Sequence, residues 1–328
     1  MKKLLASALF VLALSGPAVA QTTLKIATLA PEGSSWMKLF HTWAQKVEAR
    51  TEGRIKVKFY AGGVQGDERD VLRKIRLGQI SGCAITGIGL SSIAPEVRAL
   101  DIARTYEELD ALRAALGPDI KKKFEEKGYL LASWGDVGPV HLFSNRPVKT
   151  LEDLRQLKLW LWSDDPVSKS LFSVLNLHGV PLGVPEVLPG ISTGQIDSFF
   201  GSPLSTLALQ WGTHVKYMSS LTLSQATGAT VIAKKAWDTI PPADQKILLE
   251  EGDAMSTQVL QQVRTDNTKA LDAMKQKGLQ IVDVSPELTK ELEKAAETVA
   301  HANSGGVSKD FQDKVQKLVD NYRASKKK

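Results

Sequence analysis

Apolar and polar residues alternate along the chain in two rhythms, one typical of β-strands and the other of α-helices. Segments 22–30 and 55–63 contain the residue-by-residue alternation of half-buried strands. Segments 34–53 and 67–78 instead repeat their apolar residues at helical spacing, and each ends in a glycine, which is a common helix stop signal. The resulting strand–helix–strand–helix order predicts an α/β fold.

Two segments of the chain resemble each other closely enough to indicate a structural repeat. "DVLRKIRLGQIS" (70–81) and "EVLPGISTGQID" (186–197) align without a gap, with Val, Leu, Ile, Gly, Gln and Ile in register. An apolar, strand-like segment follows each copy. A helix–glycine–strand unit that is used twice predicts two lobes of similar build, with a cleft between them that is lined by the carboxyl ends of their strands.

The remaining segments predict how the two lobes are connected. Residues 229–237 have the pattern of a strand that returns from the second lobe, and 242–278 have the pattern of a very long helix that lies across both lobes. A short strand (279–285) and two helices (286–303 and 307–325) follow. The expected division of the chain is a signal peptide at 1–20, a first lobe from 21–138 plus 228–278, and a second lobe from 139–227 plus 279–328, with Gly138 and Pro139 as the hinge.

The N-terminus has the pattern of a secretory signal peptide. Two lysines precede a short apolar run at 4–14, and "AVA" at 18–20 fits the small-residue cleavage rule. The run is too short to span a bilayer, so we expect a mature chain that begins at Gln21 in the periplasm. The single cysteine, Cys83, excludes an intramolecular disulfide, and its apolar setting predicts a buried packing role.

Composition and motifs argue against an enzyme, a metalloprotein and a nucleic-acid-binding protein. The formal net charge is +6, but the basic residues are interspersed with acids and form no stripe with aromatic residues. The histidines are dispersed without metal-ligand spacing, and glycine-rich phosphate loops are absent. "GISTG" (190–194) matches a serine-hydrolase pattern with His214 downstream, but a predicted helix precedes Ser192 where that motif needs a strand. We therefore expect no catalytic residues, no cofactor and no metal.

One short strand carries an unusual aromatic face. In "LKLWLWSDD" (157–165) the leucines point to one side, whereas Trp160 and Trp162 point to the other. For these rings, core packing and ligand contact are equally good interpretations, because aromatic side chains fill both cores and pockets. The acids at 67–70 instead have the pattern of a solvated helix N-terminus. Further aromatic residues of the same ambiguous kind lie at predicted ends of elements: Trp36, Trp134, Phe199, Phe200 and Trp211.

Longer stretches of the chain resemble a known family of receptors. "GGVQGDERDVLRKIRLGQI", "NRPVKTLEDLRQLKLW", "GVPLGVPEVLPGISTGQID" and "AKKAWDTIPPADQKILLE" are similar to segments of the DctP-type solute-binding receptors of tripartite ATP-independent periplasmic (TRAP) transporters. The resemblance covers nearly all of the mature sequence. It implies two α/β lobes that are joined by crossing strands and a long helix and that close on a ligand. It also implies delivery of that ligand to integral-membrane permease subunits, driven by an ion gradient.

The sequence departs from the family pattern at the positions that would bind a carboxylate. In that pattern the stretch matching "QLKLW" ends in an arginine that forms a bidentate pair with the ligand, whereas here the position is Trp160. Val140 stands where a second arginine is common. Leu29, Thr86 and Gly89 occupy positions that are polar ligand contacts elsewhere in the family. Since no other arginine is expected at a cleft-facing strand end, Trp160 should face an apolar cleft lined by aromatic residues.

These observations predict a periplasmic solute-binding receptor for a small hydrophobic or weakly polar ligand. One alternative keeps an organic-acid ligand, with its charge neutralised by backbone N–H groups or by a basic residue outside the motif. Another is a periplasmic interaction protein that has lost transport and acts through a protein partner, and a periplasmic accessory protein would also be compatible with the receptor function. The expected ligand-contacting residues are Trp160, Val140, Trp162, Thr86, Leu29, Phe200, Gly89, Trp36, Trp134 and Trp211.

Overall fold

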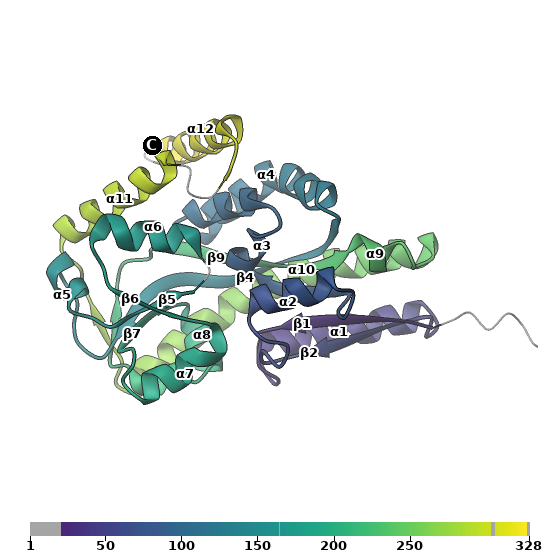
Figure 1. The fold of residues 1–328 in the computed structure, drawn as a ribbon, viewed down its shortest axis with the longest axis horizontal. Coiled ribbons are helices and arrows are strands. Elements are labelled where there is room, and N and C mark those ends of the chain that lie inside the picture. The colour runs from purple at the N-terminus through teal and green to yellow at the C-terminus, as the bar shows by residue number, and fades with distance from the viewer. Residues whose placement is uncertain (1–20, 164, 303–305, 327–328) are drawn as a thin grey trace, which may run out of the picture.

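Two α/β lobes are joined by strands that run through both of them (Figure 1). The computed structural model describes residues 21–163, 165–302 and 306–326, so the expected signal peptide lies outside the described residues. The strands are β1 (Thr22–Thr28), β2 (Ile55–Tyr60), β3 (Gly82–Thr86), β4 (Tyr129–Ser144), β5 (Leu159–Trp162), β6 (Gly179–Leu182), β7 (Ser198–Gly201), β8 (Tyr217–Ser219), β9 (Ser224–Ala233) and β10 (Gln280–Val282).

The strand order shows how the lobes share their sheet. Neighbouring strands follow the order β2-β1-β3-β9-β4-β7-β5-β6, and β8 pairs with both β4 and β10. In the first lobe β1 lies parallel to β2 and β3, and in the second lobe β5 lies parallel to β6 and β7. The antiparallel pair β4 and β9 lies between these parallel groups, so each lobe has the parallel core that its alternating sequence predicts.

Helices cover both faces of this sheet (Figure 1). None of the helices among the described residues is long and apolar enough to cross a membrane. The described part of the chain also forms two 3-10 helices, η1 (Pro95–Ile102) and η2 (Trp211–His214). The α-helices are α1 (Ser35–Arg50), α2 (Glu68–Arg76), α3 (Gly87–Leu90), α4 (Tyr106–Glu126), α5 (Leu151–Arg155), α6 (Pro166–Leu175), α7 (Val184–Ser192), α8 (Pro203–Ala208), α9 (Lys234–Trp237), α10 (Pro242–Gln276), α11 (Pro286–His301) and α12 (Lys309–Lys326).

The predicted repeat is confirmed in the structure. In the first lobe α2 is followed directly by β3, and in the second lobe α7 is followed directly by β7. Each strand then forms part of the central sheet of its lobe, where apolar residues of both copies are buried. The two matching sequence segments are therefore equivalent units in two lobes of similar build.

Strand β4 carries the chain from one lobe to the other. It pairs with β9 from Tyr129 to Val140 and then continues along β7. The proposed hinge residue Gly138 lies in this crossing segment, next to an irregularity in the register after Asp136. Its φ is +119°, and a Cβ there would lie 2.3 Å from Nδ2 of Asn267, so only glycine fits at this position.

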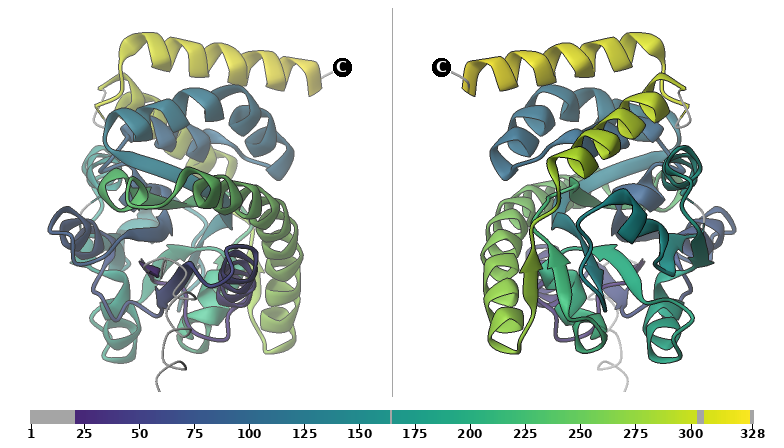
Figure 2. Two further views of the ribbon diagram at one scale, coloured as in Figure 1. Left: turned by 90° about the vertical axis from the view of Figure 1, so that its right-hand side faces the viewer. Right: turned by 90° about the vertical axis from the view of Figure 1, so that its left-hand side faces the viewer.

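The long helix α10 confirms the element predicted at 242–278. It extends along one side of the molecule and packs against α1, β4 and α8 (Figure 2). Gly252 lies where the helix crosses β4, and a Cβ on it would stand 2.0 Å from the carbonyl oxygen of Ala132. This glycine therefore permits a close approach between helix and sheet, which offsets the lower helix propensity of glycine.

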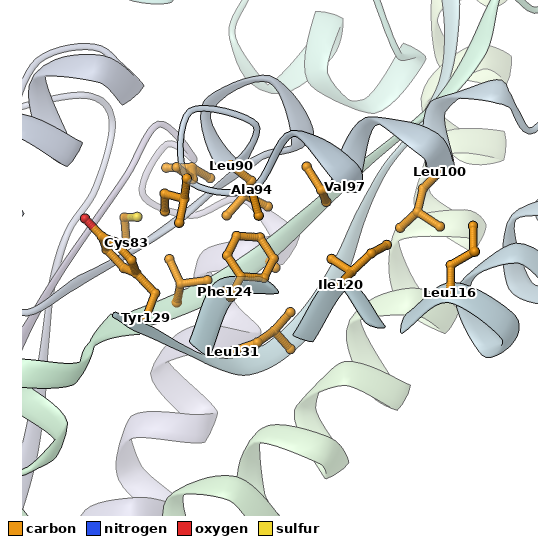
Figure 3. Close-up of a cluster of buried hydrophobic side chains, with 14 of the residues drawn as sticks. Cys83, Leu90, Ala94, Val97, Leu100, Leu116, Ile120, Phe124, Tyr129 and Leu131 are labelled. Atoms are coloured by element: carbon orange, nitrogen blue, oxygen red, sulfur yellow. The ribbon is translucent and has the colours of Figure 1, made fainter. Parts of the chain in front are cut away.

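The core of the first lobe buries Cys83, as predicted (Figure 3). The thiol lies among apolar side chains of β3, η1, α4 and β4. The same core also receives Phe311, Val315 and Val319 from α12, which packs against α4. The division expected from the sequence placed 279–328 in the second lobe, but the apolar face of α12 is buried against the first lobe instead.

Candidate functional site

A cavity of about 1370 Å³ lies between the two lobes. The carboxyl ends of β1 and β3 border it from the first lobe, and those of β5 and β7 border it from the second. Segments of β4 and β9 connect the two sides, and the cavity continues along α6, α11 and α12. A cleft at the carboxyl ends of parallel strands is the usual ligand site of open α/β folds.

Nine of the ten residues that the sequence suggested as ligand contacts line this cavity, and Gly89 is the exception. Gly89 is buried in α3, where its N–H donates to Oε2 of Glu68 at 2.8 Å. Thr86 lies at the start of the same helix, and its side chain accepts a hydrogen bond from the N–H of Ile88. Thr86 therefore borders the cavity directly, whereas Gly89 lies outside the lining and contacts the lining residue Glu68.

Trp160 lies in the core of the second lobe and borders the cavity from there. Its side chain is only 5% exposed, and its indole N–H donates to the carbonyl oxygen of Leu182 at 3.0 Å. Trp211 packs edge-on against it at 5.4 Å between ring centroids, and Trp162 lies at 5.5 Å. Core packing and cavity lining, which the sequence left as alternatives, thus coincide in the same ring.

Trp162 connects the two lobes across the cleft. Its indole N–H donates to Oδ2 of Asp67, at the start of α2 in the first lobe, at 2.8 Å. The N–H of Val184, at the start of α7 in the second lobe, donates to the same oxygen at 3.3 Å. One carboxylate of the first lobe thus receives two hydrogen bonds from the second.

Glu68 was read from the sequence as part of a solvated helix N-terminus, and this prediction is wrong. Its side chain is 2% exposed, because the start of α2 packs against α3 beside the cavity. The carboxyl group accepts hydrogen bonds from the N–H and hydroxyl of Thr86 and from the N–H of Gly89. Burial raises the pKa of Glu68 to about 8, although the hydrogen bonds from Thr86 and Gly89 oppose this shift.

Arg98 is a cavity residue that the sequence analysis missed, because that search considered only strand ends. It lies in η1, with Nε 2.6 Å from Oδ2 of Asp101 and with Nη1 donating to Oδ1 of Asp165 at 3.1 Å. Asp165 belongs to the second lobe, so this ion pair also joins the lobes. Burial raises the pKa of Asp101 to about 6, and the positive charge of Arg98 opposes this shift.

The cations around the cavity are already neutralised within the protein. Among the described residues, each basic side chain that lines the cavity lies within ion-pair distance of a carboxylate. These residues are Arg98, Arg104, Lys309 and Arg323. A ligand carboxylate would therefore have to compete with an aspartate or a glutamate of the protein for its counter-charge.

Trp36 and Trp134 border the cavity next to a buried charge network. The indole N–H of Trp36 donates to the carbonyl oxygen of Asp136 at 3.0 Å. The Asp136 carboxylate is paired with Arg113 and with Arg264, and the guanidinium of Arg113 lies 5.8 Å from the Trp134 ring centroid. These contacts fix the positions of both tryptophans within the first lobe.

The serine of "GISTG" does come close to a histidine, but the pair lacks the rest of a hydrolase site. Oγ of Ser192 lies 3.4 Å from Nε2 of His214, and the same hydroxyl donates to the carbonyl oxygen of Leu188 within α7. Both side chains are exposed, and His214 forms no hydrogen bond with an acid among the described residues. Ser192 ends a helix, whereas the hydrolase motif places its serine between a strand and a helix.

The two-lobe fold, with a cavity lined from both lobes, defines the class of extracytoplasmic solute-binding receptors. The model of the family "Bacterial extracellular solute-binding protein, family 7", named DctP, matches residues 26–304. The chain therefore belongs to this family, and the resemblance to TRAP receptors is confirmed. Receptors of this type bind small ligands and work with membrane permease subunits, and they are not enzymes.

Individual relatives match most of the chain at low sequence identity. The C4-dicarboxylate-binding periplasmic protein DctP of Rhodobacter capsulatus is 27% identical over 286 residues, which are 84% of this chain and 82% of that protein. DctP7 of Bordetella pertussis, a receptor solved with pyroglutamic acid, has a TM-score of 0.82 and 21% identity over 92% of this chain and 99% of its own. A TRAP receptor from Xanthobacter autotrophicus with bound β-D-galacturonate has a TM-score of 0.83 and 17% identity, and the match covers 90% of this chain and 99% of that receptor. The structural matches establish the shared fold.

Proposed function

We propose that the protein is a periplasmic receptor that captures a small hydrophobic or weakly polar ligand and delivers it to the membrane subunits of a TRAP transporter. The observation that supports this ligand class is the chemistry of the cavity wall. Tryptophans from both lobes border the cavity, whereas every basic side chain among its described lining residues is paired with a protein carboxylate.

The energetics of burial favour such a ligand. A ligand carboxylate that enters the cavity would lose its hydration without gaining an unpaired cation as a partner, which costs several kcal/mol. An apolar ligand gains roughly 25 cal/mol for each Å² that it buries. Covering ~100 Å² against the rings of Trp160 and its neighbours contributes about 2.5 kcal/mol, or nearly two decades in affinity.

Calorimetric titration tests this ligand class directly. Hexanol, as a neutral apolar probe, should bind to the purified receptor more tightly than succinate does. The reverse order would contradict the proposal and support an acid receptor.

Periplasmic localisation is part of the same proposal. A secretory signal at 1–20 is cleaved during export, so N-terminal sequencing of protein from the periplasm should begin at Gln21. Cytosolic protein with an intact N-terminus would contradict both the localisation and the transport function.

An organic-acid ligand is the second candidate, and Arg98 is the observation that favours it. This arginine lines the cavity, and it could exchange Asp101 or Asp165 for a ligand carboxylate. The relatives provide independent support, since one is named for binding C4-dicarboxylates and another holds β-D-galacturonate. Under this alternative, galacturonate or succinate should bind tightly to the wild type and lose its affinity in Arg98→Met.

A further inference from the structure

The cavity between the lobes extends along α6 and α11, which pack side by side at the edge of the second lobe (Figure 1). We name this part of the cavity the side chamber. Its apolar lining residues are Leu171, Phe172 and Leu175 of α6, Leu288 and Leu292 of α11, and Phe200 of β7. Ser168, Thr289 and Glu293 of the same helices add a smaller polar part to the lining.

Several side chains that line the side chamber also belong to the core of the second lobe. Phe172, Leu175 and Leu288 are each less than 9% exposed. Protein interiors are normally close-packed, and apolar gaps within them reduce stability. A mainly apolar part of a ligand cavity is therefore suited to an apolar group of the ligand.

The size of the cavity points to a ligand larger than a simple organic acid. Pockets for drug-sized molecules usually measure roughly 300–1,000 Å³. The cavity here, which includes the side chamber, measures about 1370 Å³. A compact solute would fill only a part of this volume.

Polar groups lie where the side chamber meets the cleft. Asp165 caps the N-terminus of α6, the helix that forms one wall of the side chamber, and it is paired with Arg98 from the first lobe. A ligand that extends from the cleft into the side chamber would thus have charged side chains near one part and mainly apolar side chains around the other.

We propose that the side chamber binds the hydrocarbon chain of an amphipathic ligand whose polar end lies in the cleft between the lobes. This inference rests on the proposed function, because it assigns the apolar ligand to a particular class. Each methylene that enters the side chamber should tighten binding about fourfold, which is the effect of burying one such group.

The test uses straight-chain alcohols from butanol through hexanol and octanol to decanol, titrated calorimetrically into the full-length mature protein. Affinity should rise about fourfold per methylene along the whole series. Leu292→Trp on α11 and Leu171→Trp on α6 each place a larger side chain in the side chamber, so in either variant the affinity should no longer rise beyond hexanol. Lys290→Trp, at an exposed position of α11 outside the cavity wall, should behave as the wild type does.

The outcomes separate the side chamber from the proposed function. If hexanol binds but the affinity of the wild type does not rise further toward decanol, the side chamber does not bind a chain, although the apolar cleft stands. The same conclusion follows if both wall variants keep the chain-length dependence of Lys290→Trp. If no alcohol of the series binds and succinate or galacturonate does, the proposed function fails together with this inference.

Discussion

Replacing Trp162 with phenylalanine should shift the ligand-free protein toward a more open form. The Trp162 indole N–H donates to Asp67 at 2.8 Å, and this hydrogen bond joins the second lobe to the first. Trp162→Phe keeps an aromatic ring at the cavity wall but removes the donor. The hydrogen bond from Val184 to Asp67 and the ion pair between Arg98 and Asp165 remain.

The size of the shift follows from the type of hydrogen bond that is lost. A hydrogen bond to a charged group contributes about 1.5–3 kcal/mol, and the lower end applies here because both side chains are half-buried. A loss of ~1.5 kcal/mol changes the ratio of closed to open molecules about tenfold. Ligands that bind only the closed form should lose affinity by up to the same factor, because less of the protein is competent to bind them.

Small-angle X-ray scattering of the ligand-free protein measures this shift as a larger radius of gyration. Trp36→Phe is the matched control, since it removes an indole N–H bond to Asp136 that lies within the first lobe. The control should keep the wild-type radius, whereas Trp162→Phe should exceed it. Equal radii for the wild type and both variants would refute the role of the Trp162–Asp67 contact in closing the lobes.

Three further predictions concern buried groups around the cavity. Because burial raises the pKa of Glu68 to about 8, the folded protein holds a proton that the unfolded chain releases near pH 4.5. The free energy of unfolding should therefore fall as the pH rises between these two values. Glu68→Gln should flatten this fall in thermal melts. Arg98→Met leaves the buried Asp165 and the partly buried Asp101 without their cation, so chemical denaturation should reveal a loss of ~3–5 kcal/mol in the free energy of unfolding. A loss below ~1 kcal/mol would contradict a stabilising role of this pairing. Trp160→Ala should reduce stability by about 3–5 kcal/mol and weaken hexanol binding tenfold or more, and unchanged hexanol affinity would remove this ring from the binding site.

Local sequence patterns were sufficient to predict most of the fold. The repeat at 70–81 and 186–197 identified two equivalent lobes, because a helix, a turn and a buried strand each leave a periodic trace in the sequence. The helix at 242–276 was visible for the same reason. The position of α12 could not be predicted in this way. Its amphipathic pattern indicates that one face is buried, but it does not indicate which lobe buries that face.

The site was harder to predict, because its contacts join residues that are far apart in the chain. The pairs Trp162–Asp67 and Arg98–Asp165 exist only once the two lobes lie together. Glu68 looked like an exposed helix-start acid, and its burial depends on the packing of α2 against α3. The sequence singled out Trp160 as unusual, but it could not show that Leu159 and Trp160, on opposite faces of β5, are both buried.

Native mass spectrometry of protein purified from the periplasm without refolding is the most direct test of an apolar ligand. A ligand that co-purifies is weighed together with the protein, and its mass and fragmentation identify its class. We expect a neutral or amphipathic molecule with a long hydrocarbon part. A bound dicarboxylate or sugar acid would contradict the proposed ligand class. The same conclusion would follow if the protein retains no neutral or amphipathic molecule and binds only organic acids when ligands are added back.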